Sequence, residues 1–251
     1  MKPPQKIHTA LVTGASRGLG AAIAIELAAQ GAQVAVNYHQ NKSAADHVCE
    51  QICSLGGTAH PIQADVRDEA EVARLIREVT QIFGDIDILV PNATGPQPFL
   101  SIEEQTWTAY LTQLEFFVKS PLLLLKQVLP AMRRNHFGRI IQIGSEVVEL
   151  GNPRFANYVS AKAAQLGLTR SWALELATTG ITVNLVAPGW IPTERHADAT
   201  PAELAAYASR VPMKRMGTAE DIAKTVAFLA SEAANFITGQ KISVNGANTL
   251  A

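Results

Sequence analysis

The sequence predicts an α/β protein in which a parallel β-sheet carries helices on both faces. Short runs rich in β-branched residues alternate with longer stretches of helical period along the whole chain. No internal repeat, low-complexity segment or linker interrupts this alternation. The 251 residues are 47% hydrophobic and 17% charged, which suffices for a large core and argues against disorder. We therefore expect a single domain, residues 1–251, with a Rossmann-type doubly wound parallel sheet.

The predicted strands are short, β-branched and bounded by turn residues. They cover residues 8–13, 33–37, 58–64, 86–90, 139–143, 182–186 and 241–244. The predicted helices repeat apolar residues at three- and four-residue steps. They cover residues 18–30, 43–55 and 68–83, then a long helical region after residue 90 that runs to about residue 134, and a helix that opens at residue 157. Ligands of such a sheet bind at the carboxyl ends of its strands.

Residues 192–215 form a polar, proline-marked insertion that departs from this pattern. Its position beside the expected crevice favours a substrate lid. An ordinary surface excursion would give the same composition, so this alternative stays open.

Charge and hydropathy exclude several classes of partner. The formal net charge is −1, from 21 basic and 22 acidic residues, so a nucleic-acid-binding protein is not expected. The longest apolar run, residues 121–125, is far too short to span a bilayer, and residues 1–6 do not lead into an apolar signal core. We therefore expect a cytoplasmic protein. Its two cysteines, Cys49 and Cys53, predict partly buried free thiols and no metal site.

A glycine-rich loop connects the first strand to the first helix. Gly14, Gly18 and Gly20 allow a sharp turn and let backbone N–H groups approach a pyrophosphate at the helix N-terminus. The spacing differs from the commoner G-x-G-x-x-G motif, and a purely structural turn is the alternative. The position between strand and helix favours a dinucleotide site.

The second strand predicts the choice of dinucleotide. Proteins that bind NAD place an acidic residue near its end, where it holds the ribose 2′-hydroxyl. Here no acid follows until Asp46, whereas Arg17 lies in the glycine loop and Lys42 follows the strand. The absence of a carboxylate at the end of this strand and the presence of two nearby cations favour a 2′-phosphate on the ribose. We therefore expect NADP(H) rather than NAD(H). Arg17 as a solvated loop residue is the alternative.

Three residues predict the chemistry. Tyr158 and Lys162 lie four apart on one helical face, and Ser145 ends a strand at the carboxyl edge of the sheet. Hydride transfer to a carbonyl develops an alkoxide that needs a proton donor. A nearby ammonium would lower the pKa of the tyrosine towards neutrality, and the serine hydroxyl would orient the carbonyl. We expect Tyr158 to be the acid/base.

Together these residues resemble the short-chain dehydrogenase/reductase family, especially members similar to 3-oxoacyl-(acyl-carrier-protein) reductases. The likeness runs nearly end to end and includes the segments 13–20, 65–66, 91–94, 188–193, 238–240 and 244–246. It implies that Ser145, Tyr158 and Lys162 are catalytic and that Lys162 also holds the nicotinamide ribose. It implies cofactor contacts from Gly14, Ser16, Arg17, Gly18, Leu19, Gly20, Asn37, Tyr38, Asp65, Val66, Asn92, Ala93, Thr94, Tyr158, Lys162, Pro188, Gly189, Ile191 and Thr193.

The resemblance also implies a homotetramer, in which helices before Ser145 and after Tyr158 form a bundle between subunits. The apolar residues 122–125 and 163–177 fit such burial, but they fit the core of a monomer equally well.

Two departures from the family pattern stand out. Counting back from residue 138 puts Phe117 at the position of the family's catalytic asparagine, whereas counting forward from Trp107 puts Leu114 there. Neither residue can hold the water that the asparagine holds, and the mismatch of the two counts suggests a small insertion. Thr94 replaces a glycine close to the expected nicotinamide site.

We therefore expect an NADPH-dependent oxidoreductase that interconverts a carbonyl and a secondary alcohol. A non-catalytic NADP(H)-binding or sensing protein, and an epimerase or dehydratase on the same scaffold, are the alternatives. The substrate is a keto-acyl thioester, a β-keto ester or a compact ketone. The candidate pocket residues are Pro96, Phe99, Glu146, Val148, Arg154, Phe155, Trp190, His196 and Tyr207. Arg154 either meets an anionic substrate or is a solvated loop cation.

Overall fold

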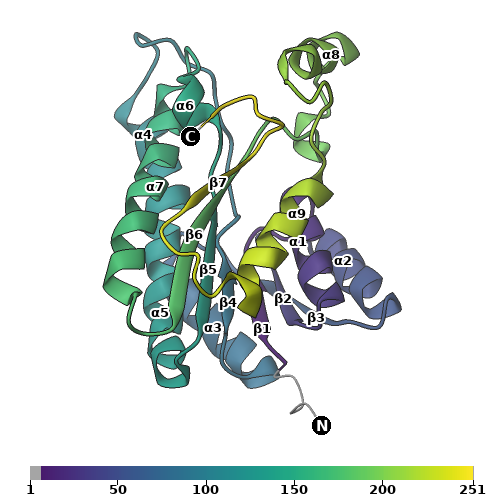
Figure 1. Cartoon of the computed structure of the whole chain (residues 1–251), viewed down its shortest axis with the longest axis vertical. Helices are drawn as coiled ribbons and strands as arrows, with labels where there is room; N and C mark the ends of the chain where they lie inside the picture. Colours follow the sequence, from purple (N-terminus) through teal and green to yellow (C-terminus); the bar gives the residue numbers. More distant parts are fainter. Residues whose placement is uncertain (1–6, 251) are drawn as a thin grey trace.

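A computed structural model describes residues 7–250 of the chain and confirms the predicted fold class (Figure 1). Seven strands form one parallel sheet in the order β3-β2-β1-β4-β5-β6-β7. The strands are β1 (Thr9–Val12), β2 (Gln33–Tyr38), β3 (Thr58–Gln63), β4 (Ile88–Val90), β5 (Gly138–Ile143), β6 (Ile181–Pro188) and β7 (Lys241–Val244). Residues 1–6, on which the expectation about export rests, and residue 251 lie outside the described residues.

Helices cover both faces of the sheet. They are α1 (Gly18–Ala29), α2 (Lys42–Ser54), α3 (Glu69–Phe83), α4 (Trp107–Leu114), α5 (Ser120–Asn135), α6 (Val147–Leu150), α7 (Ala156–Leu176), α8 (Pro201–Arg210) and α9 (Ala219–Ala230). Most of these helices pack on the sheet through one of two buried apolar clusters. One cluster joins the sheet to α1, α2 and α9, and the other joins it to α3, α5 and α7. In Figure 1 these two groups lie on the right and the left of the sheet.

The order in which the chain adds strands to the sheet reverses between β1 and β4. From β1 the chain builds outward through β2 and β3, and it then returns to β4 and builds through β5, β6 and β7 to the other edge. The connections after β1 and β4 therefore leave in opposite directions, which opens a crevice at the carboxyl ends of these strands. The ligand site expected from the sequence lies at this edge.

The long helical region expected after residue 90 is wrong for its first part. The structure has no helix between residues 91 and 106, and α4 begins only at Trp107, where the Thr106 side chain accepts a hydrogen bond from the Ala109 N–H at 3.2 Å. Pro91, Pro96 and Pro98 explain the difference, because proline lacks the N–H that a helix interior requires. This extended segment runs along the carboxyl edge of the sheet instead.

The insertion 192–215 contains a helix that the sequence analysis did not predict. Helix α8 begins with a capping box, in which Thr200 accepts from the Glu203 N–H and the Glu203 carboxylate accepts from the Thr200 N–H. Pro201 occupies the first turn, where its fixed φ suits a helix. Thr200, Pro201 and Glu203 together form the sequence pattern that predicts the start of a helix here. Figure 1 shows α8 beyond the carboxyl ends of the strands, across from α4 and α6.

Within residues 7–250, no helix is long and apolar enough to cross a membrane. The same residues contain no group of three or more His, Cys, Asp or Glu side chains that could hold a metal ion. Cys49 and Cys53 are free thiols, the first buried and the second exposed, and burial raises the pKa of Cys49 to about 12.

The packing of α3 on the sheet predicts a stability effect. Leu75 is fully buried there, so Leu75→Ala removes apolar contacts and leaves a cavity. We expect the free energy of unfolding to fall by about 3 kcal/mol in urea titrations. The matched control is Leu55→Ala, because Leu55 at the end of α2 is 70% exposed. Equal losses for the two variants would contradict the described core.

Candidate active site

The glycine loop forms a close-fitting cradle at the N-terminus of α1. Gly14 and Gly18 have φ angles of +61° and +58°, which favour glycine. A Cβ on Gly14 would lie 2.8 Å from Ala93 Cα, and one on Gly20 would lie 2.6 Å from the Asn92 side-chain amide. Glycine at these two positions thus lets the loop pack directly against residues 92 and 93 at the helix N-terminus. This arrangement fits the pyrophosphate of a dinucleotide.

Polar side chains fasten this loop to the neighbouring strands. The Thr13 hydroxyl accepts hydrogen bonds from the Asn92 and Ala93 N–H groups at 2.9 and 3.0 Å. In return, the Asn92 side chain donates to the Thr13 and Gly14 carbonyls at 2.9 and 3.2 Å. The Asn37 side chain accepts from the Gly14 N–H at 3.2 Å. The turn is therefore rigid before any ligand arrives.

The predicted cofactor residues divide into two groups. The structure brings the glycine loop together with the segments 92–94 and 193, since a Cβ on Gly18 would contact Thr193 at 3.5 Å. Four other predicted side chains are buried in the protein as hydrogen-bonding or core groups. They are Asn37, Tyr38, Val66 and Ile191.

The cations expected near the second strand differ in their partners. Lys42 forms an ion pair with Asp46 at 2.8 Å, so its charge is already compensated. Asp65 accepts hydrogen bonds from Arg67 at 2.6 and 3.0 Å, and this contact holds the pKa of the Asp65 carboxyl below its ordinary value. Arg17 is exposed at the beginning of α1. Arg17 is therefore the better candidate for a phosphate contact.

Ser145, Tyr158 and Lys162 meet at the carboxyl edge of the sheet. Ser145 follows β5, and Tyr158 lies in the first turn of α7 with its hydroxyl hydrogen-bonded to the Ser145 side chain. The Gln97 side chain makes a second hydrogen bond to Tyr158. Lys162, one turn further along α7, is 4% exposed and donates to the Ile143 carbonyl at 2.6 Å and to Gln165 at 3.1 Å.

Burial dominates the electrostatics of this pair. Burial raises the pKa of Tyr158, while the charge of Arg195 and the hydrogen bonds from Ser145 and Gln97 oppose that rise. Burial lowers the pKa of Lys162 well below its ordinary value, and Arg195 adds to this effect. The sequence analysis expected Lys162 to lower the pKa of Tyr158. In the structure the cation that acts on Tyr158 is Arg195.

Phe117 takes the position beside the catalytic lysine. Its ring is 2% exposed, with the Lys162 ammonium 3.7 Å from the ring centroid and the Tyr158 ring edge-on at 5.5 Å. Phe117 lies in a single π-helical turn, Glu115–Lys119, where the α4–α5 helix accommodates an extra residue. One extra residue is fewer than the three by which the two counts differ, so the π-helical turn explains the mismatch only in part. The aromatic face stabilises the ammonium but holds no water.

Aromatic rings form one wall of the crevice. Phe99 stacks on Phe155 at 4.2 Å, and Phe155 stacks on Tyr158 at 4.7 Å. Phe99 is 61% exposed, so a large apolar surface faces the entrance. The expected pocket residue Arg154 is exposed and forms an ion pair with Glu104 at 3.3 Å.

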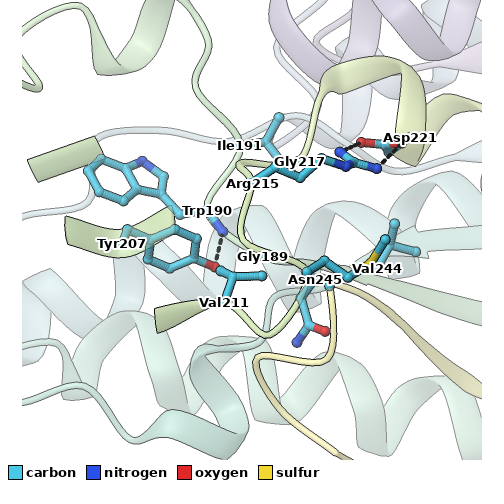
Figure 2. A pocket seen from close by; sticks show the side chains of 12 residues that line it. Gly189, Trp190, Ile191, Tyr207, Val211, Arg215, Gly217, Asp221, Val244 and Asn245 are labelled. Atoms are coloured by element: carbon cyan, nitrogen blue, oxygen red, sulfur yellow. Dashed lines mark hydrogen bonds and ion pairs between the residues drawn. The ribbon is translucent and has the colours of Figure 1, made fainter. Parts of the chain in front are cut away.

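Glu146, also expected in the pocket, is instead a buried hub. Its carboxylate accepts hydrogen bonds from the Tyr207 hydroxyl and from the Asn245 and Asn248 side chains at 3.0 and 3.1 Å. Because a buried carboxylate must be satisfied by donors, these contacts tie α8 and the residues after β7 to the end of β5. The Tyr207 hydroxyl also accepts from the Trp190 N–H at 2.8 Å (Figure 2).

A cavity of about 140 Å³ lies beside this hub (Figure 2). It is bordered by the Arg215–Asp221 ion pair, at 2.7 Å, and by Asn245. None of Ser145, Tyr158 and Lys162 lines it. This cavity is therefore separate from the place where the side chains of Ser145 and Tyr158 lie together.

The fold and the glycine loop are those of a dinucleotide-binding protein. The family model described as enoyl-(acyl carrier protein) reductase matches residues 14–248. The 3-oxoacyl-[acyl-carrier-protein] reductase FabG of Staphylococcus aureus is 45% identical over 95% of this chain and 96% of its own length. The 3-oxoacyl-[acyl-carrier-protein] reductase of Synechocystis is 41% identical over 95% and 96%.

Solved structures agree with these relatives. A mutant form of a Serratia marcescens short-chain dehydrogenase/reductase superposes with a TM-score of 0.91, at 34% identity over 99% of this chain and 100% of its own. The promiscuous reductase LugOII, which catalyses keto-reduction at C1 during lugdunomycin biosynthesis, gives a TM-score of 0.89 at 35% identity over 97% and 98%. The chain belongs to the short-chain dehydrogenase/reductase family, and its function is that of a ketoreductase-like oxidoreductase with a nicotinamide cofactor.

The cradle predicts how Gly20 responds to substitution. Gly20→Ala places a methyl group against the Asn92 amide and the Gly14 backbone, which must shift the loop. We expect affinity for the nicotinamide cofactor to fall by about tenfold or more, measured by quenching of tryptophan fluorescence. Gly167→Ala in α7 is the control, because nothing lies within 4 Å of its added Cβ. Unchanged affinity in Gly20→Ala would contradict the cradle.

Proposed function

We propose that this protein is an NADPH-dependent reductase that converts a ketone carbonyl to a secondary alcohol. The observation that carries the proposal is the contact between the Ser145 and Tyr158 hydroxyls, beside a buried lysine and next to the glycine cradle. Two hydroxyls that meet at one point can both bind one carbonyl oxygen. A sensing protein would not require this arrangement.

The residues of the chain divide the chemistry between them. When bound, the nicotinamide supplies a hydride with its electron pair to the carbonyl carbon. The Tyr158 hydroxyl donates the proton that the developing alkoxide needs, and Ser145 donates a hydrogen bond that orients the same oxygen. The surroundings of Tyr158 are dry, because it is 8% exposed and packed between Phe117 and Phe155. Lys162 lies one turn further along α7 to bind the ribose, and the charge of Arg195 favours the tyrosinate.

Preference for NADPH over NADH rests on the cations and on the absence of an acid at the end of β2. The side chains that follow this strand within residues 38–42 include no carboxylate, and Arg17 is exposed at the start of α1. We assign the 2′-phosphate contact to Arg17 rather than to Lys42, because Lys42 is paired with Asp46.

This assignment predicts a change in cofactor selectivity. Arg17→Ala should lower the ratio of kcat/KM for NADPH to that for NADH by about tenfold or more, since it removes a charge-assisted contact to the phosphate. Lys42→Ala is the matched control, with an expected change of about twofold or less. Equal kcat/KM values for the two cofactors in the unmodified protein would contradict the preference itself.

The substrate is proposed from the relatives and from the aromatic wall. The named relatives reduce 3-oxoacyl groups on a carrier protein, and the exposed ring of Phe99 offers an apolar surface for an acyl chain. A first panel therefore contains an acetoacetyl thioester, a β-keto ester and a compact ketone.

Oxidation of NADPH by one of these carbonyls tests the reaction directly, through loss of absorbance of the reduced nicotinamide. Tyr158→Phe should lower turnover by about 10²- to 10⁴-fold while cofactor affinity stays unchanged, because only the proton donor is lost. Tyr110→Phe, in α4, is the matched control and should retain turnover. Tight NADPH binding without any turnover would favour the sensing alternative, whereas product formation without net NADPH consumption would favour an epimerase or dehydratase.

We further propose a cytoplasmic homotetramer. Of the apolar run 122–125, Leu124 and Leu125 are buried in the chain's own core, whereas Leu122 is 43% exposed. Leu174 on α7 is 81% exposed. These two outward-facing leucines on α5 and α7 support a contact between subunits.

A further inference from the structure

A second cation stands at the entrance of the active site, at a position that the sequence analysis did not select. Arg195 lies in the short 3₁₀ turn Glu194–His196, two residues beyond Thr193. Its guanidinium donates to the Gly95 carbonyl at 2.8 Å and to the Thr94 hydroxyl at 3.3 Å. Arg195 thus reaches from the insertion 192–215 to the extended segment after β4.

Arg195 is linked to the proton donor through two side chains. Gln97 donates to the Thr94 hydroxyl at 3.1 Å and is also hydrogen-bonded to Tyr158. The charge of Arg195 acts on both Tyr158 and Lys162. A group bound at the guanidinium would therefore lie close to a carbonyl held by Tyr158 and Ser145.

The positive charge of Arg195 has no acidic partner among residues 7–250. Its hydrogen-bond partners, a backbone carbonyl and a hydroxyl, are both neutral. Arg154 at the same entrance differs, because Glu104 compensates it. The charge of Arg17 also acts on Arg195, so two cations lie at this part of the crevice. Such a site attracts anions.

We propose that Arg195 is a specificity-determining residue that binds a carboxylate of the substrate next to the reacting carbonyl. The planar guanidinium matches a carboxylate with two parallel hydrogen bonds, and the bonds to Thr94 and Gly95 hold it in place for this contact. Phe99 and Phe155 supply the apolar wall opposite this polar end. The inference rests on the proposed ketone reduction and adds keto acids, a substrate class that the acetoacetyl thioester and the β-keto ester of the first panel do not represent.

The test compares two substrates that differ only in charge. Acetoacetate carries the carboxylate, and methyl acetoacetate is its neutral ester. We expect Arg195→Met to lower the ratio of kcat/KM for acetoacetate to that for the ester by about 10- to 100-fold. The ratio cancels any general effect of the substitution on Tyr158. Added salt should weaken the preference of the unmodified enzyme, because an exposed charge pair is screened.

Arg154→Met is the matched control, since it removes a compensated arginine from the same entrance. In this variant the ratio of kcat/KM for acetoacetate to that for methyl acetoacetate should change by about twofold or less. An unchanged ratio in Arg195→Met would overturn the proposal. An equal loss of NADPH affinity in that variant, with no change in the ratio, would instead assign Arg195 to the dinucleotide.

A binding measurement separates this inference from the proposed function. The complex of NADPH with 3-hydroxybutyrate cannot transfer a hydride, so its formation reports carboxylate binding alone. Tryptophan fluorescence should show tighter binding of 3-hydroxybutyrate than of its methyl ester, and Arg195→Met should abolish the difference. If the protein reduced no carbonyl but kept this difference, the proposed reaction would fail while the carboxylate site stood. Equal binding of acid and ester would refute the site.

Discussion

The approach of the β1–α1 turn to the end of β4 is the contact on which the rest of the site depends. Thr13 accepts from two N–H groups of the neighbouring segment, and Asn92 returns two hydrogen bonds. Only glycine permits the remaining distance, because a Cβ at Gly14 or Gly20 would meet backbone or amide atoms. This contact joins the strands at which the sheet reverses, so it sets the crevice into which Ser145, Tyr158 and Arg195 project.

Desolvation shapes the chemistry of this crevice as much as its charges do. Burial disfavours the charged form of both side chains, raising the pKa of Tyr158 and lowering that of Lys162. Phe117 offsets part of the penalty for the lysine, because its ring faces the ammonium at 3.7 Å. The residue that departs from the family pattern thus has a physical role in the site. Arg195, nearer the solvent, supplies the charge that acts on Tyr158.

The sequence predicted those features that depend on residues close together along the chain. The glycine loop and the Tyr158–Lys162 pair follow from spacing, and the strands follow from runs of apolar residues. Prediction from the sequence failed in segments where proline and helix-forming patterns occur together. The prolines after β4 end the helical pattern, although the apolar periodicity around them suggested a helix. Helix α8 begins at a capping box at Thr200, whereas the prolines of the same segment predicted an irregular insertion.

Local spacing and strand order in the sequence were sufficient to predict the doubly wound fold and the glycine loop, and they selected Ser145, Tyr158 and Lys162 as candidates. Only the tertiary structure decided which polar side chains face the crevice. It turned Glu146 inward to hold α8, compensated Arg154 with Glu104, and left Arg195 beside the proton donor. The partners of these three residues lie 50 or more positions away along the chain. The charge that a side chain contributes to the crevice depends on such partners, and the spacing of residues along the chain does not identify them.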